Sequence, residues 1–312
     1  MFDAAGMRVM RAIADHGSYT AAAASLGYTQ PAVSQMVRRL EQRAGTVLVE
    51  RLGRSVRLTE AGRVLARHAG LVLTALDNAE AEVTAIAGMQ AGRVRLMAFP
   101  SSSAVLVPRA LAKVRAEHPG VTIQFSEGEP EESLAAVREG ACDLAVAFTY
   151  DGTDVGRGVD DLQGLDVIEM LTDPVLVALP AQHRLAAQEV VALTDLAPEP
   201  WIAGCPRCRG HLLALAGRAG FAPDVAFETE DYVAVLGLVA AGLGVALVPA
   251  LILNSVSHEA VVTRAIEPPS RRSVHVVTTP DLRRVPAVEA TISALQLSAR
   301  ELTDSAYQGE AV

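Results

Sequence analysis

The feature that most constrains the fold of this chain is a pair of short helices predicted near its start, with a glycine turn between them. An Ala-rich helix is predicted over residues 19–26, Gly27 provides the turn, and a second helix follows over residues 30–43. A preceding helix over residues 3–15 is apolar on one face, so the three helices can share a core. Two short helices around such a turn form a helix-turn-helix, whose second helix enters the major groove of DNA.

The second of these helices has one apolar and one polar face. Thr29 is its expected N-cap, and Pro31 lies in the first turn, where a missing N–H group costs little. The residues spaced for burial are Val33, Val37 and Leu40. The opposite face carries Gln30, Pro31, Ser34, Gln35 and Arg38. We therefore expect the apolar face to pack on the first two helices and the polar face to meet a ligand.

Charge is distributed unevenly along the chain. The net charge is −9, yet residues 1–59 hold eight arginines and four acidic residues, a net of +4. A basic segment attracts polyanions, whereas the acidic remainder indicates a different ligand. Residues 48–59 are predicted to form a two-stranded wing that turns at Gly53 and offers basic side chains to phosphates or the minor groove. These side chains are Arg51, Arg54 and Arg57.

An ordered run of motifs gives the first sixty residues a specific resemblance. The segments that carry it are TQPAVS at residues 29–34, Leu40-Glu41, Arg51, Arg54, and LTEAG at residues 58–62. They resemble the DNA-binding head of LysR-type transcriptional regulators. The chain departs from the family at Val49, where Phe is usual, and we expect slightly weaker packing of the wing there.

The resemblance implies a role for each polar residue of the head. It implies that Gln30 and Pro31 approach base edges, and an amide side chain suits adenine N6 and N7. It also implies that Ser34 and the arginines meet phosphates of duplex DNA. The alternative is that these are ordinary solvated side chains. The predicted DNA-binding residues are Thr29, Gln30, Pro31, Ser34, Gln35, Arg38, Arg51 and Arg54.

Residues 60–90 are predicted to form one linker helix with Thr59 as its cap. Apolar residues recur every three or four positions between Val64 and Ile86, and about 28 residues span about 40 Å. A long helix with an apolar seam needs a partner, either another helix or its own body. The resemblance favours an antiparallel homodimer or a homotetramer, in which paired heads read two half-sites.

Residues 91–302 alternate predicted strands and helices, which favours parallel sheets with flanking helices. Two such sets, joined near residues 149–165 and 265–272, predict two lobes around a cleft. The first lobe is expected at about 91–164 plus 268–302, and the second at 165–267. The fold class is therefore α/β with an all-α winged helix-turn-helix head. The resemblance implies a two-lobed, periplasmic-binding-protein-like effector domain, and residues 303–312 are predicted to be a flexible tail.

Ligands of such sheets bind at the carboxyl ends of the strands. Ser101, Ser102 and Ser103 lie between a predicted strand and a predicted helix start, where hydroxyl and free N–H groups suit an anion, although ordinary capping is the alternative. Other strand ends carry further candidates. The remaining predicted effector-binding residues are Ser126, Thr149, Ala203, Cys205 and Thr229.

The segment CPRCRGH at residues 205–211 leaves three interpretations open. Cys205 and Cys208 are ordinary cysteines, a redox pair, or, together with His211, ligands of a metal ion. Flanking arginines and a helix N-terminus would lower the pKa of a thiol. A structural zinc site normally needs a fourth ligand, so this motif is half of one.

Several function classes are disfavoured by what the sequence lacks. We find no nucleophile elbow, no Walker sequence, no secretory signal and no membrane-spanning apolar run, and three cysteines fit a reducing compartment. The prediction is a cytoplasmic, non-enzymatic regulator without a cofactor, which binds double-stranded DNA and a small-molecule effector. RNA polymerase is a further expected partner. A solute-binding protein or enzyme on the same fold is the alternative from another class.

Overall fold

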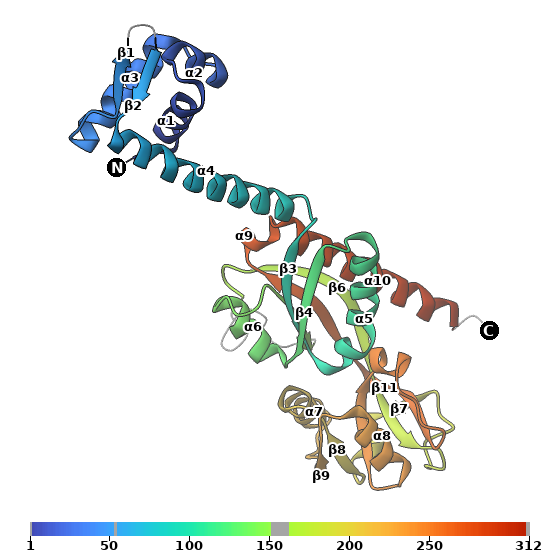
Figure 1. Ribbon diagram of the computed structural model, residues 1–312. Coiled ribbons are helices and arrows are strands. Elements are labelled where there is room, and N and C mark those ends of the chain that lie inside the picture. Colours follow the sequence, from blue (N-terminus) through green and yellow to red (C-terminus); the bar gives the residue numbers. More distant parts are fainter. Residues whose placement is uncertain (1, 53–54, 151–161, 310–312) are drawn as a thin grey trace. The chain divides into compact units, whose positions relative to one another are not determined.

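The computed structural model describes residues 2–52, 55–150 and 162–309 and divides the chain into two compact units, residues 1–86 and residues 87–312 (Figure 1). The first unit holds the predicted head and nearly the whole linker helix. The second unit holds the predicted effector domain. Each unit has a hydrophobic core of its own.

Three helices and a hairpin form the head. They are α1 (Ala4–His16), α2 (Tyr19–Leu26), α3 (Gln30–Ala44), β1 (Val49–Leu52) and β2 (Ser55–Leu58). Ser18 caps α2 by accepting the N–H of Ala21 on its Oγ at 3.0 Å, and Gly27 ends the helix at a φ of 70°, which favours glycine. Val33 and Val37 of α3 are buried against the other two helices. The predicted helix-turn-helix is thus confirmed.

The linker helix α4 spans Glu60–Ala87, three residues less than predicted. Thr59 caps it, because its Oγ1 accepts the N–H of Gly62 at 3.1 Å. A side chain at residue 62 would collide with the carbonyl oxygen of Leu48, so glycine lets α4 approach the wing closely. Much of the apolar seam of α4 is exposed. Its exposed members are Val64, Leu71, Val72, Leu76, Val83 and Ile86.

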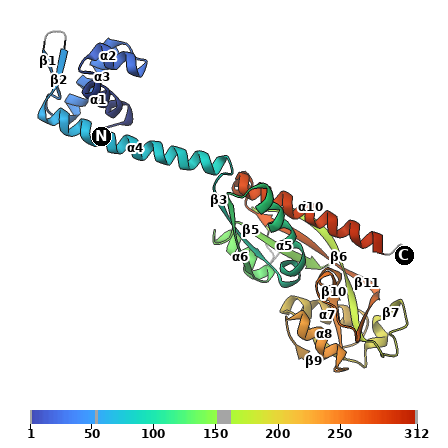
Figure 2. The ribbon, with the colours of Figure 1, turned by 45° about the vertical axis from the view of Figure 1, so that its right-hand side comes forward.

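The second unit is built on one nine-stranded sheet in the order β4-β3-β5-β11-β6-β10-β8-β9, with β7 beside β11 (Figures 1 and 2). Its strands are β3 (Gly92–Ala98), β4 (Val121–Glu127), β5 (Leu144–Tyr150), β6 (Asp166–Pro180), β7 (Val190–Ala192), β8 (Pro200–Ala203), β9 (Asp224–Glu228), β10 (Val245–Pro249) and β11 (Val261–Thr278). Its helices are α5 (Pro100–Glu117), α6 (Pro130–Arg138), α7 (Pro206–Arg218), α8 (Tyr232–Ala240), α9 (Pro280–Arg283) and α10 (Pro286–Gly309), with 3₁₀ turns η2 (Leu193–Leu196) and η3 (Ala250–Asn254).

Two long antiparallel strands, β6 and β11, run through both lobes. Residues 272–277 of β11 pair with β5 of the first lobe, whereas residues 175–178 of β6 pair with β10 of the second. The alternation of strands and helices predicted two separate parallel sheets. This prediction is wrong, because the two lobes share one mixed sheet. The second lobe also does not begin at residue 165, since residues 166–173 still pair with the first-lobe part of β11.

Two further predictions are corrected by the second unit. The sequence pattern predicts two separate strands, at residues 165–171 and 174–179, but the structure joins them into the single strand β6, in which Pro174 is paired with Arg271. The prediction of a flexible tail from residue 303 is wrong for residues 303–309, because α10 continues to Gly309. Leu302 is buried in the first-lobe core, and the hydroxyl of Thr303 donates to the carbonyl of Ala299, so burial and local hydrogen bonding extend the helix.

Candidate functional site

The polar face of α3 is open to solvent in the first unit. Thr29, Pro31, Gln35 and Arg38 are exposed, and Gln30 and Ser34 are partly exposed. Thr29 occupies the cap position in extended backbone, yet its side chain makes no capping hydrogen bond. The predicted outward face is thus confirmed, while the side-chain cap is not, and the Thr29 hydroxyl is left on the same surface as the polar residues of α3.

The wing is fixed to α3 by a carboxylate. Glu41 Oε1 accepts the N–H of Leu48 at 2.9 Å and that of the next residue at 3.2 Å. Arg51 reaches from β1 to α3, where its Nη2 donates to Ser34 Oγ at 3.4 Å, and its guanidinium lies 5.6 Å from the centre of the Tyr19 ring. Arg51 and the polar face of α3 therefore form one continuous surface.

The other two wing arginines differ from Arg51. Arg57 is paired across the hairpin with Glu50 at 2.7 Å, so part of its charge is already compensated within the wing. Arg54, together with Gly53, lies outside the described residues. Among the wing arginines predicted to contact phosphates, Arg51 is therefore the one that the structure places beside α3.

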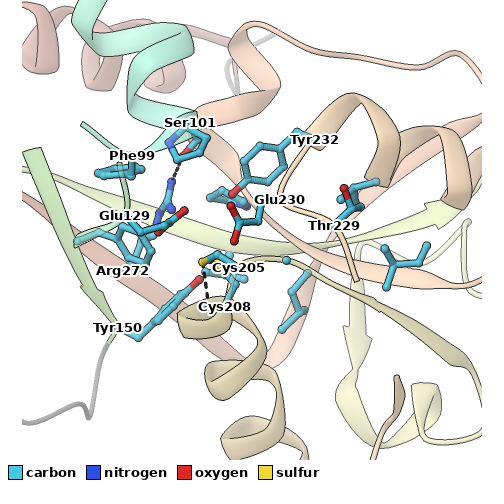
Figure 3. Close-up of a pocket in the computed structure, with 18 residues that line it drawn as sticks. Phe99, Ser101, Glu129, Tyr150, Cys205, Cys208, Thr229, Glu230, Tyr232 and Arg272 are labelled. Atoms are coloured by element: carbon cyan, nitrogen blue, oxygen red, sulfur yellow. Dashed lines mark hydrogen bonds between the residues drawn. The ribbon is translucent and has the colours of Figure 1, made fainter. Parts of the chain in front are cut away.

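A pocket lies between the two lobes of the second unit, at the carboxyl ends of several strands (Figure 3). Residues that follow β3 and β4 or lie at the end of β5 contribute to its first-lobe wall, and residues at the end of β8 or after β8 and β9 contribute to its second-lobe wall. The free volume at its centre is about 20 Å³, enough for about one water molecule. The location agrees with the general rule for ligand sites in such sheets.

A buried ion pair forms the floor of this pocket. Arg272 of β11 lies with its Nη2 2.8 Å from Asp173 Oδ2 of β6 and donates to Ser101 Oγ at 2.7 Å. Its guanidinium also lies 4.7 and 5.0 Å from the ring centres of Phe148 and Phe99. Burial acts to lower the pKa of Arg272, but the carboxylate beside it raises that pKa above its usual value, so the guanidinium stays charged.

Cys205 and Cys208 line the pocket from the start of α7. Their Sγ atoms are 2.7 Å apart, and both cysteines are free thiols in the structure. Cys205 is the N-cap of α7, where its sulfur accepts the N–H of Cys208 at 3.3 Å. Cys205 is buried and Cys208 partly buried. A three-residue spacing at a helix start therefore brings both sulfurs into contact at the pocket wall.

The two thiols differ in acidity because they share a hydrogen bond. Donation from Cys205 lowers the pKa of Cys208 to about 7, and a hydrogen bond from Tyr150 and the charge of Arg272 also act to lower it. The same shared hydrogen bond, together with burial, raises the pKa of Cys205 well above its usual value. Cys208 is thus the thiol of the pair that ionises first as the pH rises, and Cys205 is the one that keeps its proton.

Tyr150 connects the thiols to a buried histidine. Its ring stacks on that of His211 at a centroid distance of 3.6 Å and an interplanar angle of 3°. His211 Nε2 lies 2.7 Å from Ser270 Oγ on β11. Burial, assisted by the charge of Arg218, lowers the pKa of His211 to about 4, so its imidazole is neutral at pH 7.

These contacts do not assemble the metal site considered from the sequence. His211 is directed to Ser270 and Tyr150 rather than to the sulfurs. No group of three or more histidine, cysteine, aspartate or glutamate residues suited to a metal ion occurs among the described residues. The two cysteines therefore lack the additional ligands that a closed metal site requires.

The predicted effector residues divide into two groups. Ser101, Cys205 and Thr229 line the pocket, but the other five predicted residues do not. Those five are Ser102, Ser103, Ser126, Thr149 and Ala203.

Local geometry explains why each of the five is excluded. The hydroxyl of Ser103 donates to carbonyl groups of the preceding turn, and Ser102 is fully buried within the first turn of α5. Side chains alternate along β5, so Thr149 points away from the face that presents Phe148 and Tyr150. Ser126 is exposed on the edge strand β4. Ala203, which is buried in β8, offers only a methyl group to the second-lobe core.

Sequence reasoning missed the charged and aromatic residues of the pocket. Arg272 and Asp173 lie on the two long strands β11 and β6, whose antiparallel pairing was not predicted. Glu129, Tyr150 and Tyr232 follow or end strands whose positions were predicted, so a search for polar and aromatic residues at every strand end would have found them. No sequence signal pairs Arg272 with Asp173 across 99 residues.

Comparisons with known proteins agree with this architecture. Residues 5–63 match the family model described as bacterial regulatory helix-turn-helix protein, lysR family, and residues 87–299 match that described as LysR substrate binding domain. A probable hydrogen peroxide-inducible genes activator of Mycobacterium avium is 31% identical over 78% of this chain and 77% of its own. The regulator CbbR of Rhodospirillum rubrum is 28% identical over 94% and 96% of the two chains.

Solved structures have the same fold. A full-length OxyR variant of Pseudomonas aeruginosa matches with a TM-score of 0.78 at 19% identity and covers 95% of this chain and 100% of that one. The oxidised form of Corynebacterium glutamicum OxyR matches with a TM-score of 0.74 at 24% identity and covers 98% of this chain and 96% of that one.

Head, linker and two-lobed domain together define a DNA-binding transcriptional regulator that carries an effector-binding domain. The chain belongs to the LysR family of bacterial helix-turn-helix regulators. The resemblance noted in the sequence is therefore confirmed. None of the helices within the described ranges is both long and apolar enough to cross a membrane.

Proposed function

We propose that this chain is a thiol-responsive LysR-type regulator, in which oxidation of Cys205 and Cys208 in the interlobe pocket alters binding of the head to double-stranded DNA. The observation that carries the proposal is the 2.7 Å separation of the two sulfurs at the pocket wall. The lowered pKa of Cys208 and the name of the Mycobacterium avium relative support it.

The proposed chemistry has two steps. The Cys208 thiolate attacks one oxygen of a hydroperoxide, the O–O bond breaks, and the departing oxygen leaves as an alcohol or water after taking up a proton. The sulfenic acid formed on Cys208 is then attacked by the sulfur of Cys205, which loses its proton, and a disulfide and one water molecule result. Thiol reductants reverse the change. The short contact between the sulfurs supports a fast second step.

Thiol titration tests the chemistry. Hydrogen peroxide is expected to remove two of the three titratable thiols of the unfolded chain and leave Cys142, which is buried in the first lobe. The variant Cys208→Ser should form no intramolecular disulfide, and Cys142→Ser should still lose two thiols. A wild-type chain that keeps all three thiols after peroxide treatment would contradict the proposal.

DNA binding tests the output. Reduced and oxidised chain are to be compared by footprinting on genomic fragments that the reduced chain selects. We expect the two forms to differ in affinity or in the length of DNA protected, and Cys208→Ser to behave as the reduced form under both conditions. Identical footprints of the two wild-type forms would show that oxidation, where it occurs, does not regulate DNA binding.

The exposed seam of α4 supports assembly with a second copy of the chain. Leu71 and Val83 are 69% and 66% exposed on this helix, although both are apolar. Pairing of two such seams would bury them and join two heads, as recognition of two half-sites requires. Leu71→Glu should shift sedimentation toward the monomer, and Arg67→Ala on the same helix should not. A wild-type monomer at micromolar concentration would contradict this assembly.

A further inference from the structure

We infer that the pocket selects its oxidant by charge, admitting uncharged hydroperoxides and disfavouring anionic oxidants, with Glu129 and Glu230 as the selecting residues. The inference rests on the thiol response proposed above and adds the chemical class of the oxidant. Three observations support it: the apolar walls of the pocket, the balance of charge around the thiols, and a buried carboxylate oxygen without a hydrogen-bond partner.

Apolar and aromatic side chains form most of the pocket surface (Figure 3). Phe99 and Phe148 come from the first lobe, and Ile202 and Val235 from the second. Charged molecules lose hydration on entering such surroundings and need a compensating charge, whereas an uncharged molecule does not. The walls therefore favour an uncharged oxidant unless the pocket offers a free positive group to an anion.

The positive groups near the thiols are already engaged. Arg272 is paired with Asp173 at 2.8 Å, and Arg207 lies against Phe148, with its Nη2 3.8 Å from Glu131. The N-terminus of α7 also attracts anions, but its Cys208 N–H group is directed at the Cys205 sulfur. An incoming anion thus finds little positive charge that is not compensated.

The acidic groups of the pocket are not compensated in this way. Glu129 and Glu230 line it, the first partly buried and the second exposed at the rim, and neither has an ion-pair partner within residues 55–150 and 162–309. Burial raises the pKa of Glu129 and the charge of Glu230 adds to the rise, while Cys205 and the charges of two arginines, Arg272 and Arg207, act to lower it. When ionised, these carboxyl groups and the thiol of Cys208 make the potential in the pocket negative, which repels an anionic oxidant.

One oxygen of Glu129 is suited to receive a hydroperoxide. Glu129 Oε2 is buried and has no hydrogen-bond partner among the described residues. A buried acceptor without a partner is costly, and the O–H group of a hydroperoxide would supply one. Glu129 and Cys205 line the same pocket and influence each other's ionisation, so an oxidant held by Glu129 lies beside the thiol pair.

Paired oxidation rates test the inference. Hydrogen peroxide, which is uncharged, and peroxymonosulfate, which is an anion, are reacted with the reduced full chain, and formation of the Cys205–Cys208 disulfide is followed by mass spectrometry. Each rate is divided by the rate of the same thiols in urea-unfolded chain, which removes the intrinsic reactivity of the oxidant. The normalised rate for peroxymonosulfate is expected to be at least about tenfold below that for hydrogen peroxide.

Matched variants locate the effect. Glu230→Gln is expected to raise the ratio of the peroxymonosulfate rate to the hydrogen peroxide rate about fivefold, because one negative charge leaves the pocket. Glu259→Gln removes the same charge from an exposed position that does not line the pocket and should leave the ratio unchanged. High salt should raise the wild-type ratio, since screening weakens the repulsion.

The possible outcomes separate this inference from the proposed function. A chain that forms no disulfide with either oxidant contradicts the thiol response itself. A chain that is oxidised with equal normalised rates by both oxidants keeps the thiol response and overturns selection by charge. Selection by charge is also overturned if Glu230→Gln and Glu259→Gln change the rate ratio equally.

Discussion

Arg272 and Asp173 lie on the two strands that run through both lobes, and their side chains, 2.8 Å apart, are only 1% and 2% exposed. Asp173 Oδ1 also accepts the N–H of Leu251, and Arg272 donates to Ser101. A charge pair removed this fully from water is compensated only when every member keeps its partner. The pair therefore ties β6, β11, α5 and η3 together at the base of the pocket.

Removing one partner of this pair should be strongly destabilising. Asp173→Ala leaves the buried guanidinium of Arg272 without its carboxylate, and we expect a loss of about 3–5 kcal/mol in the free energy of unfolding by urea. The double replacement Asp173→Leu with Arg272→Met should lose less, because no buried charge remains. Arg284→Ala, at an exposed pair 3.9 Å apart, should change stability by less than about 0.5 kcal/mol. Equal losses for Asp173→Ala and Arg284→Ala would refute a stabilising role of the buried pair.

Local elements of this fold could be predicted because their signals are local. The helix over 19–26 has the predicted bounds, since Ser18 and Gly27 fix its ends through capping and a positive φ. The polar face of α3 followed from helical periodicity alone. The Cys205–Cys208 spacing left a contact between the two sulfurs open as one of three interpretations, and the structure brings the sulfurs together.

The pocket floor could not be predicted because its partners are distant in sequence. Asp173-Pro174 resembles a turn, yet both residues lie inside β6, where Pro174 is paired with Arg271 of β11. Without that pairing, nothing places Arg272 near Asp173 or Ser101. Strand alternation also failed for Thr149, where one residue of register decides whether a hydroxyl faces the pocket or the opposite side of the sheet.

Tyr150 should tune the acidity of Cys208. Its hydroxyl is hydrogen-bonded with Cys208 and stabilises the thiolate, so Tyr150→Phe should raise the pKa of Cys208 from about 7 by about one unit. The ring that stacks on His211 is retained in this variant. The measurement is the pH dependence of iodoacetamide alkylation of Cys208, read by mass spectrometry. Tyr232→Phe is the control, because the hydroxyl of Tyr232 is hydrogen-bonded with Ser101 instead. Equal midpoint pH values of alkylation in wild type and in Tyr150→Phe would show that Tyr150 does not tune the acidity of Cys208.

His211 should make the second unit less stable in mild acid. Its pKa is about 4 in the folded chain, below the ordinary value of 6.5, so the unfolded chain binds the extra proton between these values. The contribution of neutral, buried His211 to the free energy of unfolding is thus complete above about pH 6.5. About 2–3 kcal/mol of it is lost as the pH falls toward 4. Urea unfolding at pH 5 and pH 7.5 measures this. His211→Gln should reduce the difference in unfolding free energy between the two pH values. His68→Gln is the control, because His68 is exposed on α4, and it should leave that difference unchanged. If His211→Gln also left the difference unchanged, His211 would not be the residue that causes the acid sensitivity.

Specific and general DNA binding should respond to different residues of the head. Gln30 lies at the start of α3 among the polar residues of its outer face, and an amide there can hydrogen-bond to a base edge. Gln30→Ala should therefore cost about 1–3 kcal/mol on the selected DNA and relax preference at one position of each half-site. Arg51→Ala should weaken binding to all sequences alike and reduce the salt slope by about one.

Salt titrations of both variants on selected and random duplexes distinguish these two effects. Gln42→Ala is a suitable control, because Gln42 is exposed on α3 but is not part of the predicted contact set. An unchanged affinity of Gln30→Ala for the selected DNA would mean that α3 does not read bases through its first turn. A loss confined to the selected DNA in Arg51→Ala would assign that arginine to base recognition instead of phosphate contact, since a phosphate contact carries no sequence information.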